Sequence, residues 1–151
     1  MNKAGLKSKK YLNINPDSSL KYSFRAAELS RLKNSASYLA KSYFAIGKVF
    51  NKTNDIDNEI IYEQKANDVA VNSSDKKFET QIILRLAESL LTKGKEEEGL
   101  LLLKKSKIMA EKIGDRDLLY DVYFLQGRAE SNPDSSANYF NAIAEHATSC
   151  S

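Results

Sequence analysis

The apolar positions of this chain recur with a period of 40 residues, and within each period they follow the spacing of helices. In the stretch 36–75, two runs with apolar residues three and four positions apart flank a polar break at 51–55. Residues at that spacing share one side of a helix, so each run predicts a helix with one buried side. A fixed period of this length is typical of stacked pairs of helices.

Five columns of the repeat can be read by adding 40 to each position. They are Tyr43, Ile83 and Tyr123; Phe44, Leu84 and Phe124; Ile46, Leu86 and Gln126; Gly47, Ala87 and Gly127; and Phe50, Leu90 and Glu130. One column holds only Gly or Ala. A Gly inside a helix costs about 1 kcal/mol relative to Ala, so we expect helices to cross closely there. The alternative is a plain helical bundle, but bundles seldom keep such a register.

The pattern also predicts where the elements begin and end. A basic segment at 1–14, which could hold a short helix, precedes a repeat domain at 15–151 with units at 15–35, 36–75, 76–115 and 116–151. Helices are expected at about 17–32, 36–52, 56–72, 76–93, 96–113, 115–131 and 134–148. Asn15 or Asp17 is expected to cap the first of these, with Pro16 in its first turn. Gly114 is expected to end a helix in the left-handed conformation.

The residues of the repeat resemble a known superfamily. In the first helix of that superfamily's repeat, a bulky residue is followed by Leu-Gly and then by an aromatic residue. In this chain, these positions hold Tyr43, Ile46-Gly47 and Phe50. Small residues seven apart in its second helix correspond to Gly99 and Ser106, and to Ser19 and Ala26. From about residue 15 the chain therefore resembles tetratricopeptide repeats in their 40-residue form, with departures at Glu59, Gln126 and Glu130. The resemblance implies an all-α fold, a right-handed superhelix of antiparallel helix pairs with about seven helices.

The resemblance also implies where a partner binds, because the first helix of each unit lines the concave face in this superfamily. Carried over by position, the groove residues are Lys41, Phe44, Lys48, Asn51, Gln81, Leu84, Glu88, Asp121, Phe124 and Arg128. Phe44, Leu84 and Phe124 fall in one column and would form an apolar strip suited to an extended or helical peptide. The alternative, equally open at this point, is that these three residues belong to the core.

Composition offers little support for catalysis. The chain has one His and one Cys, His146 and Cys150, and neither a metal-binding motif nor a phosphate-binding loop. Glu59 and Glu63, and the run Glu96 to Glu98, are expected on exposed helix faces. We therefore expect no enzyme activity, no catalytic residue, no cofactor and no metal.

Charge and hydropathy limit the classes of partner that the chain is expected to bind. Four lysines within the first ten residues account for the positive net charge, and the rest of the chain has 19 basic and 20 acidic residues. A near-neutral repeat domain argues against direct nucleic-acid binding. No apolar run reaches the length of a membrane span and no signal peptide is visible, so we expect a cytoplasmic protein. The expected partner is a protein or peptide, with pairing into a homodimer as the alternative.

The superfamily resemblance also implies in which kind of protein these repeats occur. Repeats of 40 residues resemble those of bacterial signalling and regulatory proteins. The first helix, at 17–32, matches the second helix of a unit rather than the first. We therefore expect this chain either to be a segment of a longer repeat protein or to pair with another copy of itself.

Overall fold

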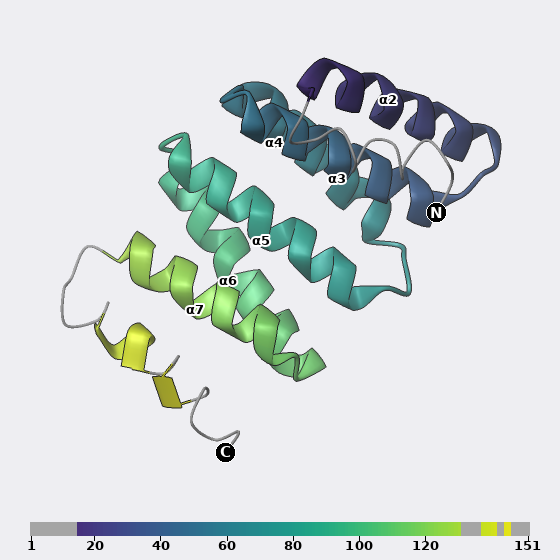
Figure 1. Cartoon of the computed structure of the whole chain (residues 1–151). Coiled ribbons are helices and arrows are strands. Elements are labelled where there is room, and N and C mark those ends of the chain that lie inside the picture. Colours follow the sequence, from purple (N-terminus) through teal and green to yellow (C-terminus); the bar gives the residue numbers. More distant parts are fainter. Residues whose placement is uncertain (1–14, 131–136, 142–143, 146–151) are drawn as a thin grey trace. The chain divides into compact units, whose positions relative to one another are not determined.

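The computed structural model describes residues 15–130, 137–141 and 144–145, and all regular structure in these ranges is helical (Figure 1). The helices are α2 (Pro16–Leu32), α3 (Ala36–Lys52), α4 (Ile56–Ala70), α5 (Lys76–Thr92), α6 (Glu96–Ile113) and α7 (Arg116–Ala129). The predicted all-α fold is confirmed, and these bounds agree with the predicted ones to about two residues. The expected segment 1–14 lies outside the described residues. Of the expected helix at 134–148, residues 137–141 and 144–145 are described, and they are helical.

Local signals set the helix ends. The side chain of Asn15 accepts a hydrogen bond from the backbone N–H of Ser18 at 3.1 Å, and Pro16 begins α2. Asp55 and Asp115 cap α4 and α7 in the same way. Gly114 ends α6 with a φ of 70°, a conformation that Gly adopts without a Cβ clash. The predicted caps at Asn15 and Gly114 are confirmed.

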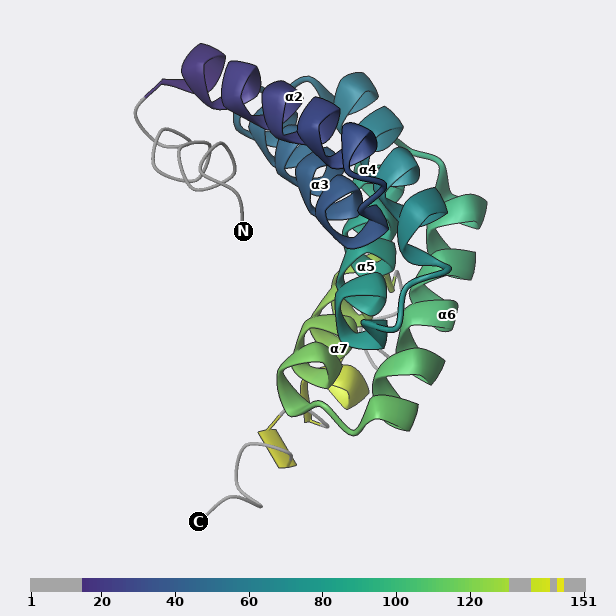
Figure 2. The same ribbon diagram turned by 90° about the vertical axis from the view of Figure 1, so that its right-hand side faces the viewer.

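The helices group into two compact units, Met1–Asp75 and Lys76–Ser151. In the first unit α3 packs against both α2 and α4, and Figure 2 shows α3 and α4 connected as a hairpin. Aromatic side chains fill the space between these helices. The ring of Tyr62 on α4 lies 5.6 Å from the ring of Phe24 and 5.6 Å from that of Phe50, measured between centroids.

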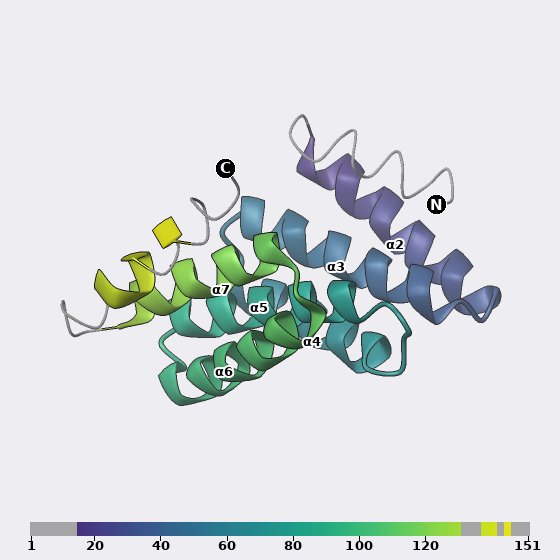
Figure 3. The same cartoon turned by 90° about the horizontal axis from the view of Figure 1, so that it is seen from below.

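In the second unit α5 packs against α6, and α7 packs against both (Figure 3). Seven buried side chains from these three helices form one apolar cluster: Leu84, Ala87, Leu103, Ala110, Leu118, Val122 and Leu125. Each helix contributes residues three, four or seven positions apart, as expected for one buried side of a helix. This cluster is the core of the unit that carries the site described below.

The column of small residues has the packing role that the repeat predicts. A Cβ added to Gly47 would lie 3.1 Å from Cγ of Glu63, which belongs to the facing helix α4. A Cβ added to Gly127 would lie 2.8 Å from Cζ of Phe140. Ala87, the third member, is fully buried. Close approach at this column is therefore confirmed.

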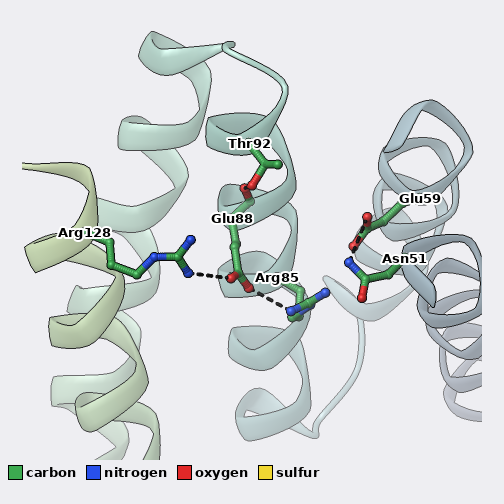
Figure 4. A network of polar contacts seen from close by, with 6 residues as sticks. All are labelled: Asn51, Glu59, Arg85, Glu88, Thr92 and Arg128. Carbon is green, nitrogen blue, oxygen red and sulfur yellow. Dashed lines mark hydrogen bonds and ion pairs between the residues drawn. The ribbon is translucent and has the colours of Figure 1, made fainter. Parts of the chain in front are cut away.

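The expectation that Glu59 and Glu63 lie on exposed helix faces is wrong. Both carboxylates are buried against α3, with 2% and 0% of the residue exposed. Gly47 on α3 leaves the room that Glu63 occupies. The side chain of Asn51, also on α3, donates a hydrogen bond to Oε2 of Glu59 at 3.2 Å (Figure 4). The buried side of α4 thus includes two carboxylates beside the small residues Ala66 and Ala70. The run Glu96 to Glu98 is exposed, as expected.

Candidate functional site

The predicted groove residues of the first unit all lie on α3. Lys41, Lys48 and Asn51 are exposed, whereas Phe44 is only 8% exposed. The ammonium of Lys48 lies 4.6 Å from the centroid of the Phe44 ring, a distance at which a cation is attracted to an aromatic face. Asn51 is engaged with Glu59. This helix therefore presents mainly polar side chains at the predicted positions.

The predicted groove residues of α5 divide between surface and core. Leu84 is also 8% exposed and belongs to the apolar cluster with Leu118 and Val122. Gln81 and Glu88 are half-buried. Leu84 therefore belongs to the core, which was the alternative to its place in a binding groove. Binding in the groove formed by all ten residues is still a prediction.

Helix α7 presents the most distinctive surface of the second unit. Five exposed residues three or four positions apart share one side of this helix: Asp117, Tyr120, Asp121, Phe124 and Arg128. We call this set the α7 face. The opposite side of α7 is buried in the core through Leu118, Val122 and Leu125. Three of the predicted site residues, Asp121, Phe124 and Arg128, are therefore brought together in the α7 face.

Stacked aromatic rings form the centre of the α7 face. The rings of Tyr120 and Phe124 are nearly parallel, with centroids 6.4 Å apart and an interplanar angle of 5°. Phe140 meets Phe124 edge-to-face at 6.3 Å. All three rings remain 41% to 52% exposed. Exposed aromatic rings grouped in this way are a feature of surfaces that bind other proteins.

An ionic network holds one end of the α7 face. Nη1 of Arg128 lies 3.1 Å from Oε1 of Glu88, and the second oxygen of Glu88 lies 2.7 Å from Nη1 of Arg85 (Figure 4). The guanidinium of Arg128 also lies 5.9 Å from the centroid of the Phe124 ring. The predicted residues Glu88 and Arg128 are therefore partners, and the positive charge of Arg128 is largely offset by Glu88.

The other end of the α7 face is acidic. Asp121 is exposed to solvent on one side but partly desolvated by its surroundings, which raises its pKa, and the nearby carboxylates of Asp117, Glu88 and Asp115 raise this pKa further. Asp115 is offset by Lys77, whose hydrogen bond lowers the pKa of Asp115. No basic side chain among the described residues pairs with Asp117 or Asp121. This part of the surface therefore carries negative charge that no described residue neutralises through an ion pair.

A groove of about 590 Å³ lies on another side of the same unit, between α6, α7 and Tyr139. Leu100, Leu103 and Ile108 supply apolar walls. Gln126 also lines the groove, and its side-chain carbonyl oxygen is buried with no hydrogen-bond partner among the described residues. The groove thus contains a polar group that the local packing does not satisfy.

We expect Gln126→Leu to raise the free energy of unfolding by about 1 kcal/mol. A buried carbonyl without a hydrogen bond costs about 1–3 kcal/mol, and Leu removes it while adding apolar contact. The same column holds Ile46 and Leu86, both buried. Urea denaturation followed by circular dichroism measures the change. Gln126→Glu, which keeps the shape but adds a charge, should lower stability, and equal stability of the two variants would contradict this account.

Within the described ranges, no three or more His, Cys, Asp or Glu residues are grouped so as to hold a metal ion. None of the helices described is both long and apolar enough to span a bilayer. His146 and Cys150 lie outside the described residues.

Two members of the aromatic group, Tyr120 and Phe140, were not among the predicted groove residues. Tyr120 lies one helical turn before Phe124, so the helix periodicity contains the signal that places both rings on one side. The contact of Phe140 with α7 depends on how the chain returns after residue 130, which periodicity does not specify.

Comparisons with known proteins bear on the fold. No family model matches the chain, and no curated protein matches it. A search of solved structures finds the structure titled "Crystal Structure of the Apo Form of RapI", with a TM-score of 0.77 and 18% sequence identity. The match covers 88% of this chain and 49% of the RapI chain, so this chain spans about half of the length of that protein. At this identity the likeness concerns the fold alone, and the chain shares the helical-repeat fold of RapI.

Proposed function

We propose that this chain is a non-catalytic, tetratricopeptide-like scaffold that binds a protein or peptide through the α7 face. The observation that carries the proposal is the exposed aromatic group in which Tyr120 and Phe124 stack and Phe140 meets Phe124 edge-to-face. Aromatic side chains supply much of the binding energy at protein interfaces, because they bury a large area with few rotatable bonds. A rigid helix whose other side is anchored in the core presents these rings without an ordering cost.

The fold likeness to RapI and the 40-residue repeats support a wider setting. We propose that the scaffold acts within a larger bacterial signalling or regulatory protein, in which the repeats recognise a partner. The ionic pair of Arg128 and Glu88 would help to fix the position of the partner on the surface and would contribute little to the affinity, since exposed ion pairs are individually weak.

We expect Phe124→Ser to weaken partner binding at least tenfold while the fold survives. Phe124 is 42% exposed and lies outside the apolar cluster, so its removal takes away binding area rather than core packing. The probe is a phage-displayed library of random 12-residue peptides, selected on the immobilised wild-type chain. Dissociation constants of the enriched peptides are then measured for both proteins by fluorescence anisotropy.

The matched control is Phe24→Ser, which removes the same type of side chain at nearly the same exposure, 41%, from α2 in the other unit. Peptides that bind through the α7 face should bind this control as they bind the wild type. If every enriched peptide binds the Phe124→Ser chain as tightly as the wild type, the α7 face is not the binding site.

A further inference from the structure

The outer side of α6 carries a second exposed surface of opposite charge. Five exposed residues share it: Leu101, Lys104, Lys105, Ile108 and Lys112. We call this set the α6 face. Leu101 and Ile108 are 68% and 58% exposed, and Ile108 also borders the groove between α6 and α7. The opposite side of the helix is buried in the core through Leu103 and Ala110.

The lysines of the α6 face are not offset within the described part of the chain. Lys104, Lys105 and Lys112 form no ion pair there, whereas Lys107, nearer the inside of the helix, lies 4.0 Å from Glu111. Three positive charges therefore surround two exposed aliphatic side chains. A surface of this kind fits an apolar partner that carries carboxylates.

The α7 face has those properties. It combines exposed Tyr120 and Phe124 with Asp117 and Asp121, two carboxylates that no described basic side chain pairs with. Helices α6 and α7 both bury their inner sides in the same apolar cluster. The two faces therefore point away from that shared core, and they cannot cover each other within one chain. The matching surfaces can meet only when they belong to different molecules.

We propose that a second copy of this chain covers the α7 face with its α6 face. Leu101 and Ile108 of one copy pack against Tyr120 and Phe124 of the next, and the lysines lie against the carboxylates. The crowding of Asp121 by other carboxylates then becomes favourable, because an arriving ammonium is attracted by all of them.

The contact is heterologous, because one copy contributes its α6 face and the other copy contributes its α7 face. Such a contact leaves one face of each kind exposed at the ends, so it continues into longer chains unless the geometry closes a ring. The inference shares the α7 face with the proposed function, so self-association and partner binding would compete for Phe124. Partner binding would then release copies from the assembly.

The first test is the mass of the full chain by light scattering across a concentration series. At low salt, about 50 mM, the weight-average mass should rise at least about twofold above that of the monomer as concentration increases. At about 500 mM salt the rise should largely disappear, because exposed charges are then screened within a few ångströms. A monomer mass at every concentration and low salt would overturn the inference, as would an increase that salt leaves unchanged.

A charge exchange between the two faces gives the sharper test. One variant carries Asp117→Asn and Asp121→Lys, which makes the α7 face basic without placing a positive charge in the first helical turn. The other carries Lys105→Glu and Lys112→Gln, which leaves the α6 face with no net charge, because only Lys104 and the new glutamate remain charged. Each variant alone should remain monomeric, because its own two faces now repel or no longer attract. An equimolar mixture should regain a mass above that of the monomer.

These outcomes separate the inference from the proposed function. All four substitutions are at exposed positions, so unchanged thermal unfolding by circular dichroism confirms that each variant is folded. Self-association by either variant alone, or a mixture that stays monomeric while the wild type associates, would overturn the inference. Peptide binding that depends on Phe124 would still support the proposed function in that case, because the peptides are selected on the immobilised chain and their binding needs no second copy.

Discussion

Leu103→Ala is expected to lower the free energy of unfolding by about 3 kcal/mol, within the range of 2–5 kcal/mol typical of buried Leu→Ala changes. Leu103 is 2% exposed and lies in the apolar cluster beside Leu84 and Val122. Truncation removes three carbon atoms from contact with α5 and α7 and leaves a cavity that the helices fill only partly. The loss would be a large fraction of the stability of a domain of this size.

Leu101→Ala is the matched control for that prediction, since the same change is made two residues away on the same helix. Leu101 is 68% exposed, so its truncation should change stability by less than about 0.5 kcal/mol. Urea denaturation followed by circular dichroism measures both variants. Similar losses for the two variants would show that α6 does not bury the side that the structure assigns to the core.

Gly99→Val is expected to cost about 2–3 kcal/mol through overpacking. A Cβ at Gly99 would lie 2.7 Å from Cγ of Leu91 and 3.1 Å from the backbone nitrogen of Leu91. The Leu91 side chain can move, but its backbone nitrogen belongs to α5 and cannot move without displacing the helix. The gain in helix propensity over Gly, below about 1 kcal/mol, offsets only part of this cost.

The double variant Gly99→Val with Leu91→Ala tests the cause of that loss. Shortening Leu91 removes the nearest side-chain atoms, so the double variant should be more stable than the sum of the two single effects predicts. Denaturation midpoints of all four proteins give the coupling. Additive losses would show that the two positions do not press against each other.

Much of the fold could be predicted from the sequence because its signals are local and repeated. The caps at Asn15 and Gly114 and the helical spacing of apolar residues place each helix to within about two residues. The 40-residue register adds the pairing of helices, because small residues at Gly47 and Gly127 lie where neighbouring segments approach closely. Agreement between local and repeated signals is what makes such a fold predictable.

The side-chain environment of single residues was harder to predict. Glu59 and Glu63 lie on the buried side of α4 because Gly47 and Asn51 across the hairpin leave room and a hydrogen-bond donor. In the next unit, the position 40 residues after Glu59 is Gly99. The sequence of α4 alone contains no sign of this, since carboxylates are usually exposed.

The repeat also could not distinguish core from surface within one column. Leu84 and Phe124 are equivalent by register, yet Leu84 is 8% exposed and Phe124 is 42% exposed. Leu84 lies on α5, which packs against both α6 and α7, whereas the Phe124 ring lies beside the rings of Tyr120 and Phe140 at the surface. Exposure depends on the number of neighbouring helices, which a register does not specify.

The most direct test of the central claim is a titration of the ¹⁵N-labelled chain with the tightest peptide from the library, followed by amide correlation spectra. If the α7 face binds the peptide, the largest shifts should fall on the amides of 117–128 and of Phe140. The same titration of the Phe124→Ser chain should produce no saturable shifts there. Largest shifts on α2 to α4, or on the α6 side of the groove at Leu100 and Leu103 with 117–128 unaffected, would contradict the account.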